Sequence, residues 1–215
     1  MKIRKYILIF SSILLLAGCN FGESTEQKLS NILSEIYDQE ADYRDVQEEL
    51  AETESKEQAN FQQMMELTKD QKEELATMVE DTATLLDTRL ALVEKEAASL
   101  NSTSDGIKQI STLISETKEP SKKENLKQIE TALKERITAY EDVTINYNEL
   151  ATMQQDLYNM LVDDSADVTA IQEQVQEVNK HNELVKQSVQ KFNDATERVN
   201  QVKEEVLTSL QKDEK

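Results

Sequence analysis

The sequence has very few residues that interrupt a regular element. Its 215 residues include three glycines, one proline and no tryptophan. Sandwiches and barrels need a turn roughly every 8 to 12 residues, and turns depend on glycine and proline. Gly18 and Gly22 lie near the N-terminus, so Gly106 and Pro120 alone serve the rest of the chain. This shortage excludes most β-rich folds, and a composition only 5% aromatic and 31% charged suits long, thin helices.

Basic residues are scarce as well. The formal net charge is -19, and loss of Lys2, Arg4 and Lys5 with a cleaved leader would change it to -22. Binding to a phosphate backbone requires clustered Lys and Arg, and anionic lipid head groups repel an acidic body. We therefore expect no nucleic-acid partner and no binding of lipid head groups by the body of the protein.

The chain also lacks the residues that most catalytic and metal sites need. His181 is the only histidine and Cys19 the only cysteine. One histidine cannot build a di-iron bundle, which needs two Glu-x-x-His motifs, and Ser/His or Cys/His catalysis has no second candidate base. The acidic turn at 163–167 lacks the Gly and Glu that a calcium loop requires at its sixth and twelfth positions. We expect a partly solvated His181, no metal, no catalytic residue and no enzymatic activity.

The N-terminus has the layout of a bacterial lipoprotein leader. Residues 2–5 are basic, and residues 6–16 form an apolar run too short to cross a bilayer. The run ends at Leu16, Ala17 and Gly18, which with Cys19 resemble a lipobox. This pattern predicts a signal peptide over 1–18, a diacylglyceryl group on Cys19 as the only covalent addition, and a polar tether over 19–25. The protein is then lipid-anchored on the extracellular face of the plasma membrane.

Apolar residues in the last segment follow a heptad pattern. If Val175 is placed at position a, then Asn182, Thr196 and Lys203 are polar a residues of the kind that fix helix register. The predicted seam comprises Ile171, Val175, Val178, Asn182, Val185, Val189, Phe192, Thr196, Val199, Lys203, Val206 and Leu210. A seam of this length predicts a long helix that packs against others.

The remaining chain shows similar helical stripes, which predicts an all-α, elongated, antiparallel up-and-down bundle over 26–212. Reversals near 67–70, 118–121 and 163–165 would divide it into four segments of matched length. The alternative keeps residues 24–100 as one bent helix that turns at 101–106, giving a three-helix array. Four helices are favoured, because matched antiparallel segments leave no seam unpaired.

Two features of these stripes are candidates for binding. Tyrosine rings can stack on sugars, so Tyr37, Tyr43, Tyr140, Tyr147 and Tyr158 form a possible ligand face, although core tyrosines have the same spacing. Between Ala51 and Gln63 the apolar pattern weakens, and Glu54 and Glu57 occupy expected core positions. A partner helix, or a second copy of the chain, would complete such an imperfect seam.

With a lipobox followed by long helices, the chain resembles the YkyA-like family of Gram-positive lipoproteins assigned to cell-wall binding. The most similar stretch is the last helix, which is punctuated by Val178-Asn179, Phe192-Asn193, Thr196, Asn200 and Lys203. The resemblance covers nearly all of the mature chain and implies an all-helical, non-catalytic envelope protein that binds peptidoglycan. Because teichoic acids are polyanions, an acidic body would bind the wall through divalent cations or uncharged glycan. The alternative function is an envelope scaffold that pairs its helices with a protein partner or with itself.

Overall fold

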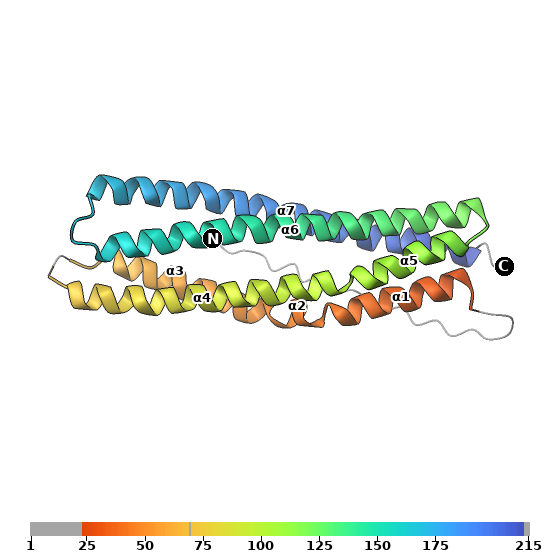
Figure 1. The fold of residues 1–215 in the computed structure, drawn as a ribbon, viewed down its shortest axis with the longest axis horizontal. Coiled ribbons are helices and arrows are strands. Elements are labelled where there is room, and N and C mark those ends of the chain that lie inside the picture. Colours follow the sequence, from red (N-terminus) through yellow and green to blue (C-terminus); the bar gives the residue numbers. More distant parts are fainter. Residues whose placement is uncertain (1–22, 69, 213–215) are drawn as a thin grey trace.

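A computed structural model describes residues 23–68 and 70–212, and in that part of the chain every regular element is an α-helix (Figure 1). The predicted leader, lipobox and Cys19 lie outside the described residues. The helices run up and down side by side. In chain order they are α1 (Thr25–Gln39), α2 (Ala41–Asp45), α3 (Gln47–Met64), α4 (Lys72–Ser102), α5 (Ser104–Glu116), α6 (Pro120–Val162) and α7 (Val168–Lys212).

The prediction of an all-α bundle is confirmed, and so is its division into four rods. The rods are α1–α3, α4–α5, α6 and α7. The chain reverses between α3 and α4, between α5 and α6, and between α6 and α7, close to the three predicted positions. The first helix begins at Thr25 rather than Glu26, because the Ser24 hydroxyl accepts a hydrogen bond from the Gln27 backbone and completes a capping box. Pro120 lies in the first turn of α6, where its missing N–H costs nothing.

The alternative with a reversal at 101–106 is wrong. Thr103, between α4 and α5, keeps a right-handed helical backbone, and Ile107 N donates to Thr103 O as it would within a helix. The chain therefore bends here without turning back. Gly106 lies beyond the bend, where an added Cβ would meet Ile36 Cγ1 at 2.5 Å. The glycine allows α5 to approach α1 closely, so its role is in packing rather than in a turn.

The two halves of the bundle are packed differently. We call the end where α1 begins and α7 ends the proximal end, and the end with the 65–71 and 163–167 connections the distal end (Figure 1). In the proximal half, α1, α5, α6 and α7 all contribute to one apolar core. In the distal half, the core cluster around Met64, Leu86 and Tyr158 comes from α3, α4 and α6 alone. The bundle is therefore closed at its proximal end and more open at its distal end.

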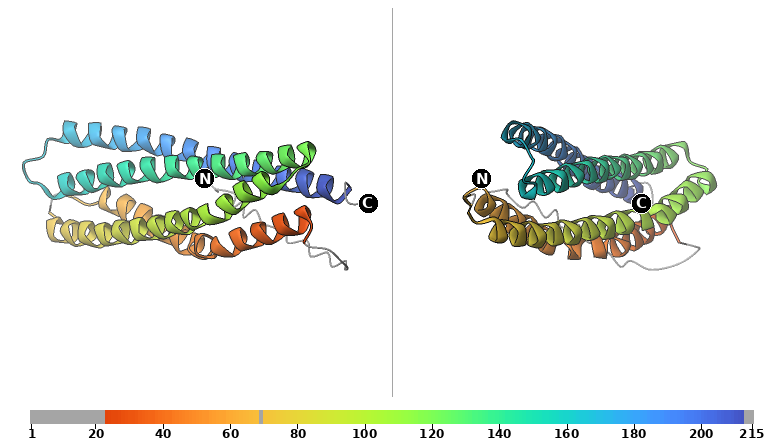
Figure 2. Two further views of the ribbon diagram at one scale, coloured as in Figure 1. Left: turned by 45° about the vertical axis from the view of Figure 1, so that its right-hand side comes forward. Right: turned by 60° about the vertical axis from the view of Figure 1, so that its left-hand side comes forward.

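Helix α7 packs on α6 along its length and also on α1, whereas it has no comparable contact with α3. Both views in Figure 2 show the first part of α7 lying apart from α3. From Val168 to Lys180 no side chain of α7 is buried. The first turns of α7 thus have one neighbouring helix, α6, where a closed bundle would supply two.

The heptad prediction for α7 has the right period, but some of the residues that it places in the core are exposed. Val185, Phe192, Val199, Val206 and Leu210 are buried as expected. Asn182 and Val189, however, are exposed. The buried positions added beside the seam are His181, Ser188 and Val202. A repeat fixes the stripe, but the neighbouring helices decide which edge of the stripe turns inward. Here α6 buries the edge that contains His181.

His181 is consequently a buried residue, which corrects the expectation of a partly solvated histidine. The residue is 7% exposed, and Nε2 lies 3.0 Å from the backbone oxygen of Asn146 on α6. The Glu149 carboxylate is 3.5 Å from the same nitrogen. The side chain therefore connects α7 to α6.

Candidate functional site: a buried carboxylate network

Three tyrosine hydroxyls on α6 donate hydrogen bonds to carboxylates of the α3–α4 pair. The tyrosines are spaced so that they share one face of α6, and that face is turned toward the interior. The pairs are Tyr140 with Glu96 at 2.5 Å, Tyr147 with Glu54 at 2.6 Å and Tyr158 with Glu57 at 2.7 Å. This Tyr–Glu ladder connects three rods along the middle and distal parts of the bundle.

Three of the five tyrosines of the predicted ligand face are therefore not on the surface. Tyr140, Tyr147 and Tyr158 are at most 6% exposed, and their hydroxyls are occupied. Tyr43 packs edge-on against Tyr140 and Phe192, with ring centroids 5.9 and 5.8 Å apart. The Tyr37 ring is half-buried beneath the Arg44 guanidinium, 3.8 Å from the ring centroid. Phenol rings are amphipathic, and the hydroxyls of Tyr140, Tyr147 and Tyr158 donate to carboxylates of the same chain.

The weak stretch from Ala51 to Gln63 is completed by the same chain. Glu57 is 2% exposed, with Arg89 of α4 as its counter-ion at 3.0 Å and the Tyr158 hydroxyl as its donor. Arg89 also donates to Gln154 of α6 and lies over the Tyr147 ring. Glu57 thus belongs to a buried ion pair, whereas Glu54 is exposed and accepts a hydrogen bond from the part-buried Tyr147 hydroxyl. Both glutamates have partners within the same chain.

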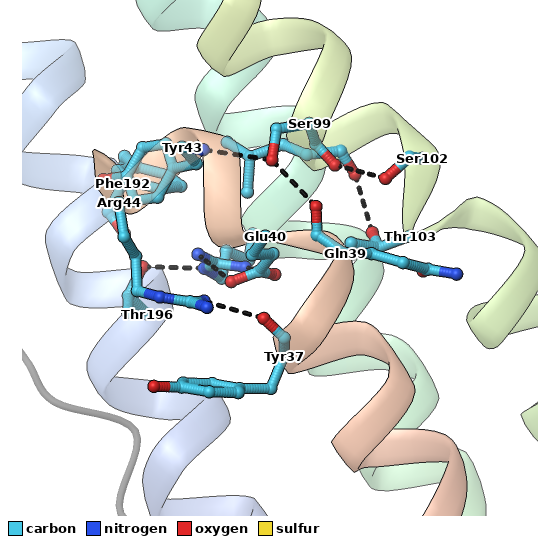
Figure 3. A network of polar contacts seen from close by, with 12 residues as sticks. Tyr37, Gln39, Glu40, Tyr43, Arg44, Ser99, Ser102, Thr103, Phe192 and Thr196 are labelled. Atoms are coloured by element: carbon cyan, nitrogen blue, oxygen red, sulfur yellow. Dashed lines mark hydrogen bonds and ion pairs between the residues drawn. The ribbon is translucent and has the colours of Figure 1, made fainter. Parts of the chain in front are cut away.

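A second polar cluster surrounds the break between α1 and α2 (Figure 3). Both terminal nitrogens of Arg136 donate to the Glu40 carboxylate, at 2.5 and 3.1 Å. Its Nε donates to Thr196 Oγ1 at 2.9 Å, and its guanidinium lies 5.1 Å from the Phe192 ring centroid. A bidentate arginine fixes geometry as well as charge. Arg136 of α6 therefore connects α7 to the α1–α2 junction, and its partner on α7 is Thr196, one of the polar a residues.

Ser99 of α4 inserts its hydroxyl into the broken helix (Figure 3). In a continuous helix Tyr43 N would donate to Gln39 O, its partner four residues earlier. Here Tyr43 N donates to Ser99 Oγ at 3.1 Å, and Ser99 Oγ donates to Gln39 O at 2.9 Å. A side chain inserted into the backbone ladder is a recognised cause of a kink. Ser99 satisfies both backbone groups and so stabilises the α1–α2 break.

Burial alters the protonation of this network. Burial is the largest cause that raises the pKa of Glu96, to about 7, against the opposing hydrogen bond from Tyr140. Burial likewise raises the pKa of Glu57, although Arg89 and Tyr158 oppose the shift. It also raises the pKa of Tyr140, Tyr147 and Tyr158 above the usual tyrosine value, which keeps them as hydroxyl donors. Glu96 is therefore the carboxylate poised to change charge near neutral pH.

The hydrogen bonds of the ladder connect helices of the same chain to one another. Each carboxylate of the ladder is occupied by a donor from the same chain. A shallow, mainly apolar hollow of about 310 Å³ lies outside Tyr140, between α4 and α6. Within residues 23–68 and 70–212, no three His, Cys, Asp or Glu side chains are grouped closely enough to hold a metal ion. No described helix is long and apolar enough to cross a membrane.

Arg89, Glu96 and Arg136 are buried polar residues that were not predicted from the sequence. All three lie at helical core spacing: Leu86, Arg89, Val93, Glu96 and Leu100 alternate three and four residues apart, and Arg136 falls between Leu133 and Tyr140. Their positions among the apolar seam residues were the signal in the sequence that these charged side chains are buried. Buried charges occur when they are paired, so opposite charges at seam positions of different segments indicate such pairs.

Comparisons with known proteins agree with the fold. The YkyA family, described as "Putative cell-wall binding lipoprotein", matches residues 24–209. An uncharacterized lipoprotein YkyA of Bacillus subtilis (strain 168) is 22% identical over 193 residues, which span 90% of this chain and 86% of that protein. A crystal structure of a conserved protein of unknown function from Staphylococcus aureus superposes with a TM-score of 0.72 at 18% identity, covering 87% of this chain and 97% of that one. With a family match over nearly its whole described length, the chain belongs to the YkyA family of lipoproteins.

Proposed function

We propose that the protein is a lipid-anchored, non-catalytic module that extends from the plasma membrane toward the cell wall and contacts peptidoglycan. The observation that carries this proposal is the direction of the bundle relative to the predicted lipid anchor. Cys19 precedes α1 by a few residues, so the lipid would be attached at the proximal end. Helix α6 has 43 residues, which at about 1.5 Å per residue is roughly 65 Å. The distal connections would then lie far from the membrane, on the side where the wall is.

Lipid attachment can be tested directly. In cells fed a labelled fatty acid, the wild-type chain should carry the label, and Cys19→Ala should lose it because the acceptor thiol is gone. An immunoblot of the same samples shows that both proteins are made. Label retained by Cys19→Ala would contradict the proposed anchor.

The contact with the wall follows from charge. An acidic body with a net charge of -19 or below is repelled by teichoic acid, so the partner is uncharged glycan, or divalent cations bridge the two surfaces. Sedimentation with purified peptidoglycan tests this. Pelleting should increase when teichoic acid is removed, and with the intact wall it should require Mg²⁺ and fall in EDTA. No pelleting with either form of wall, with or without Mg²⁺, would contradict wall binding.

A second candidate function is an envelope scaffold that pairs its helices with another chain. The stretch from Ala51 to Gln63 does not support it, because Tyr147, Tyr158 and Arg89 complete that seam internally. The observation in its favour is the first part of α7, which has α6 but not α3 as a neighbour. This part of α7 retains heptad residues that the bundle does not cover.

A further inference from the structure

The first half of α7 has an uncovered strip in which residues are spaced alternately four and three apart. These are the a and e positions of the heptad in which Val175 is an a residue. The strip comprises Val168, Gln172, Val175, Asn179, Asn182, Lys186, Val189 and Asn193. All are exposed except Val175, which is half-buried; Val168 is 62% and Val189 38% exposed. The d row beside it turns inward at Val185 and Phe192. We call this surface the α7 strip.

The α7 strip differs in charge from the rest of the molecule. It contains no Asp or Glu, although the chain has 43 acidic residues. The acids of this part of α7, Glu173, Glu177 and Glu183, lie at other heptad positions. The one charge in the strip, Lys186, donates to Glu183 beside it. A second acidic molecule could therefore approach this strip without carboxylates of the strip meeting one another, and Lys186 of each copy has Glu183 of its own chain as a partner.

The residue types in the a row indicate what covers the strip. Val168, Val175 and Val189 are β-branched, and Asn182 is the single polar residue among them. In coiled coils, β-branched a residues favour two strands, and one asparagine at an a position fixes a paired register. Side chains at a face a′ when two copies are related by a twofold axis parallel to the helices, so Asn182 of one copy can hydrogen-bond Asn182 of the other.

We infer that the α7 strip is the interface of a parallel homodimer, in which the first halves of two α7 helices pair through Val168, Val175, Asn182 and Val189. The parallel orientation rests on the lipid anchor proposed above, because two chains held in one membrane stand with their distal ends together. The interface has fewer residues on each side than the roughly 20 to 30 of a standard interface. The pair is therefore weak in dilute solution, and confinement to one membrane promotes it.

Single-cysteine cross-linking of the full chain in intact membranes tests the pairing. Residues opposite one another at a positions come close enough for a disulfide. Val175→Cys, Asn182→Cys and Val189→Cys should each give disulfide dimers under mild oxidation. The exposed neighbour Gln187→Cys should not, because its f position faces away, and wild type shows any product formed through Cys19. No dimer at any of the three positions, or as much at Gln187, would overturn the inference. Dimer at Asn182 alone would overturn the parallel register.

A charge placed in the strip provides the second test. Val189→Glu should lower cross-linking at Asn182→Cys roughly tenfold, because it places two unpaired carboxylates in the seam. Gln187→Glu adds the same charge outside the seam and should change nothing. Circular dichroism checks that both variants keep their helices. If Val189→Glu does not fold, Val189→Asn replaces it as the test variant. Unchanged cross-linking in a folded Val189→Glu protein would contradict the proposed interface.

The outcomes also separate this inference from the proposed function. Fatty-acid labelling tests the anchor and cross-linking tests the pairing, so either can fail alone. If Val189→Glu lowers retention on peptidoglycan while the cysteine variants give no dimer, the strip binds glycan and the dimer is wrong.

Discussion

At the scale of single residues, four buried charged side chains form two ion pairs. Arg136, Arg89, Glu40 and Glu57 are each at most 8% exposed, and every one has an opposite charge beside it. Burying an ion pair adds little net stability, whereas removing one partner is costly because the other charge stays buried. The pairs therefore favour one register of the four rods over alternatives with the same apolar contacts.

Glu96 makes the stability of the bundle depend on pH. Its pKa is about 7 in the folded protein, raised chiefly by burial from an ordinary value of 4.5. Between these values the folded state binds the proton more tightly than the unfolded chain, so the contribution to stability is complete below about pH 4.5 and lost as pH rises through about 7.

We expect Glu96→Gln to weaken this pH dependence. Between pH 5 and 7.5 the wild-type free energy of unfolding should fall by roughly 1 to 3 kcal/mol more than that of the variant, since glutamine cannot ionise. Urea denaturation at several pH values measures it. The exposed Glu94→Gln on the same helix is the control and should keep the wild-type slope. Equal slopes in wild type and Glu96→Gln would contradict the prediction.

At the scale of elements, two deviations from a straight rod have a local cause. The bend between α4 and α5 follows Thr103, whose hydroxyl donates to Leu100 O. The break between α1 and α2 occurs where Ser99 takes the place of a backbone hydrogen bond. These positions let the first two rods bend while α6 and α7 remain continuous.

Ser99→Ala should destabilise the protein by about 1 to 3 kcal/mol, because Tyr43 N and Gln39 O would lose their shared partner in a part-buried place. Thermal or urea denaturation measures the change. Ser102→Ala is the matched control, since its hydroxyl donates only to Ser99 O within the same helix. A Ser99→Ala protein as stable as Ser102→Ala would show that the inserted hydroxyl does not stabilise the break.

At the scale of the whole molecule, packing is unequal along the rod. The proximal core contains fully buried Leu29, Ile110, Leu126, Ile129 and Leu210 from four rods, whereas α7 contributes nothing buried before His181. Segments with few buried apolar contacts open more often than cores do.

Hydrogen exchange should reveal this gradient. In dilute, monomeric protein the amides of 168–180 should exchange faster than those of 199–210, although both lie in α7. At concentrations that favour the proposed dimer, protection of 168–180 should increase while that of 199–210 stays constant. Uniform protection along α7 in the dilute protein would contradict the description of an open distal half.

The sequence alone determined the fold class and the reversal at 163–165, and it favoured reversals near 67–70 and 118–121 without excluding one at 101–106. Helical periodicity sustained through each segment, with almost no glycine or proline, leaves long helices as the way to bury the apolar stripe. The same local signals predicted the turn near Pro120 and the acidic turn before α7. They depend on neighbours in sequence, so they can be read without knowing what packs where.

Only the tertiary structure decided which polar residues are inside and which edge of each stripe is covered. Tyr147 looked like a possible ligand residue and Glu54 like a fault in a seam, yet each is the other's hydrogen-bond partner across 93 residues of sequence. His181 is buried and Asn182 exposed, although they are neighbours on one helix. The physical reason is that a heptad pattern fixes a direction on each helix, while burial depends on which other helix lies in that direction.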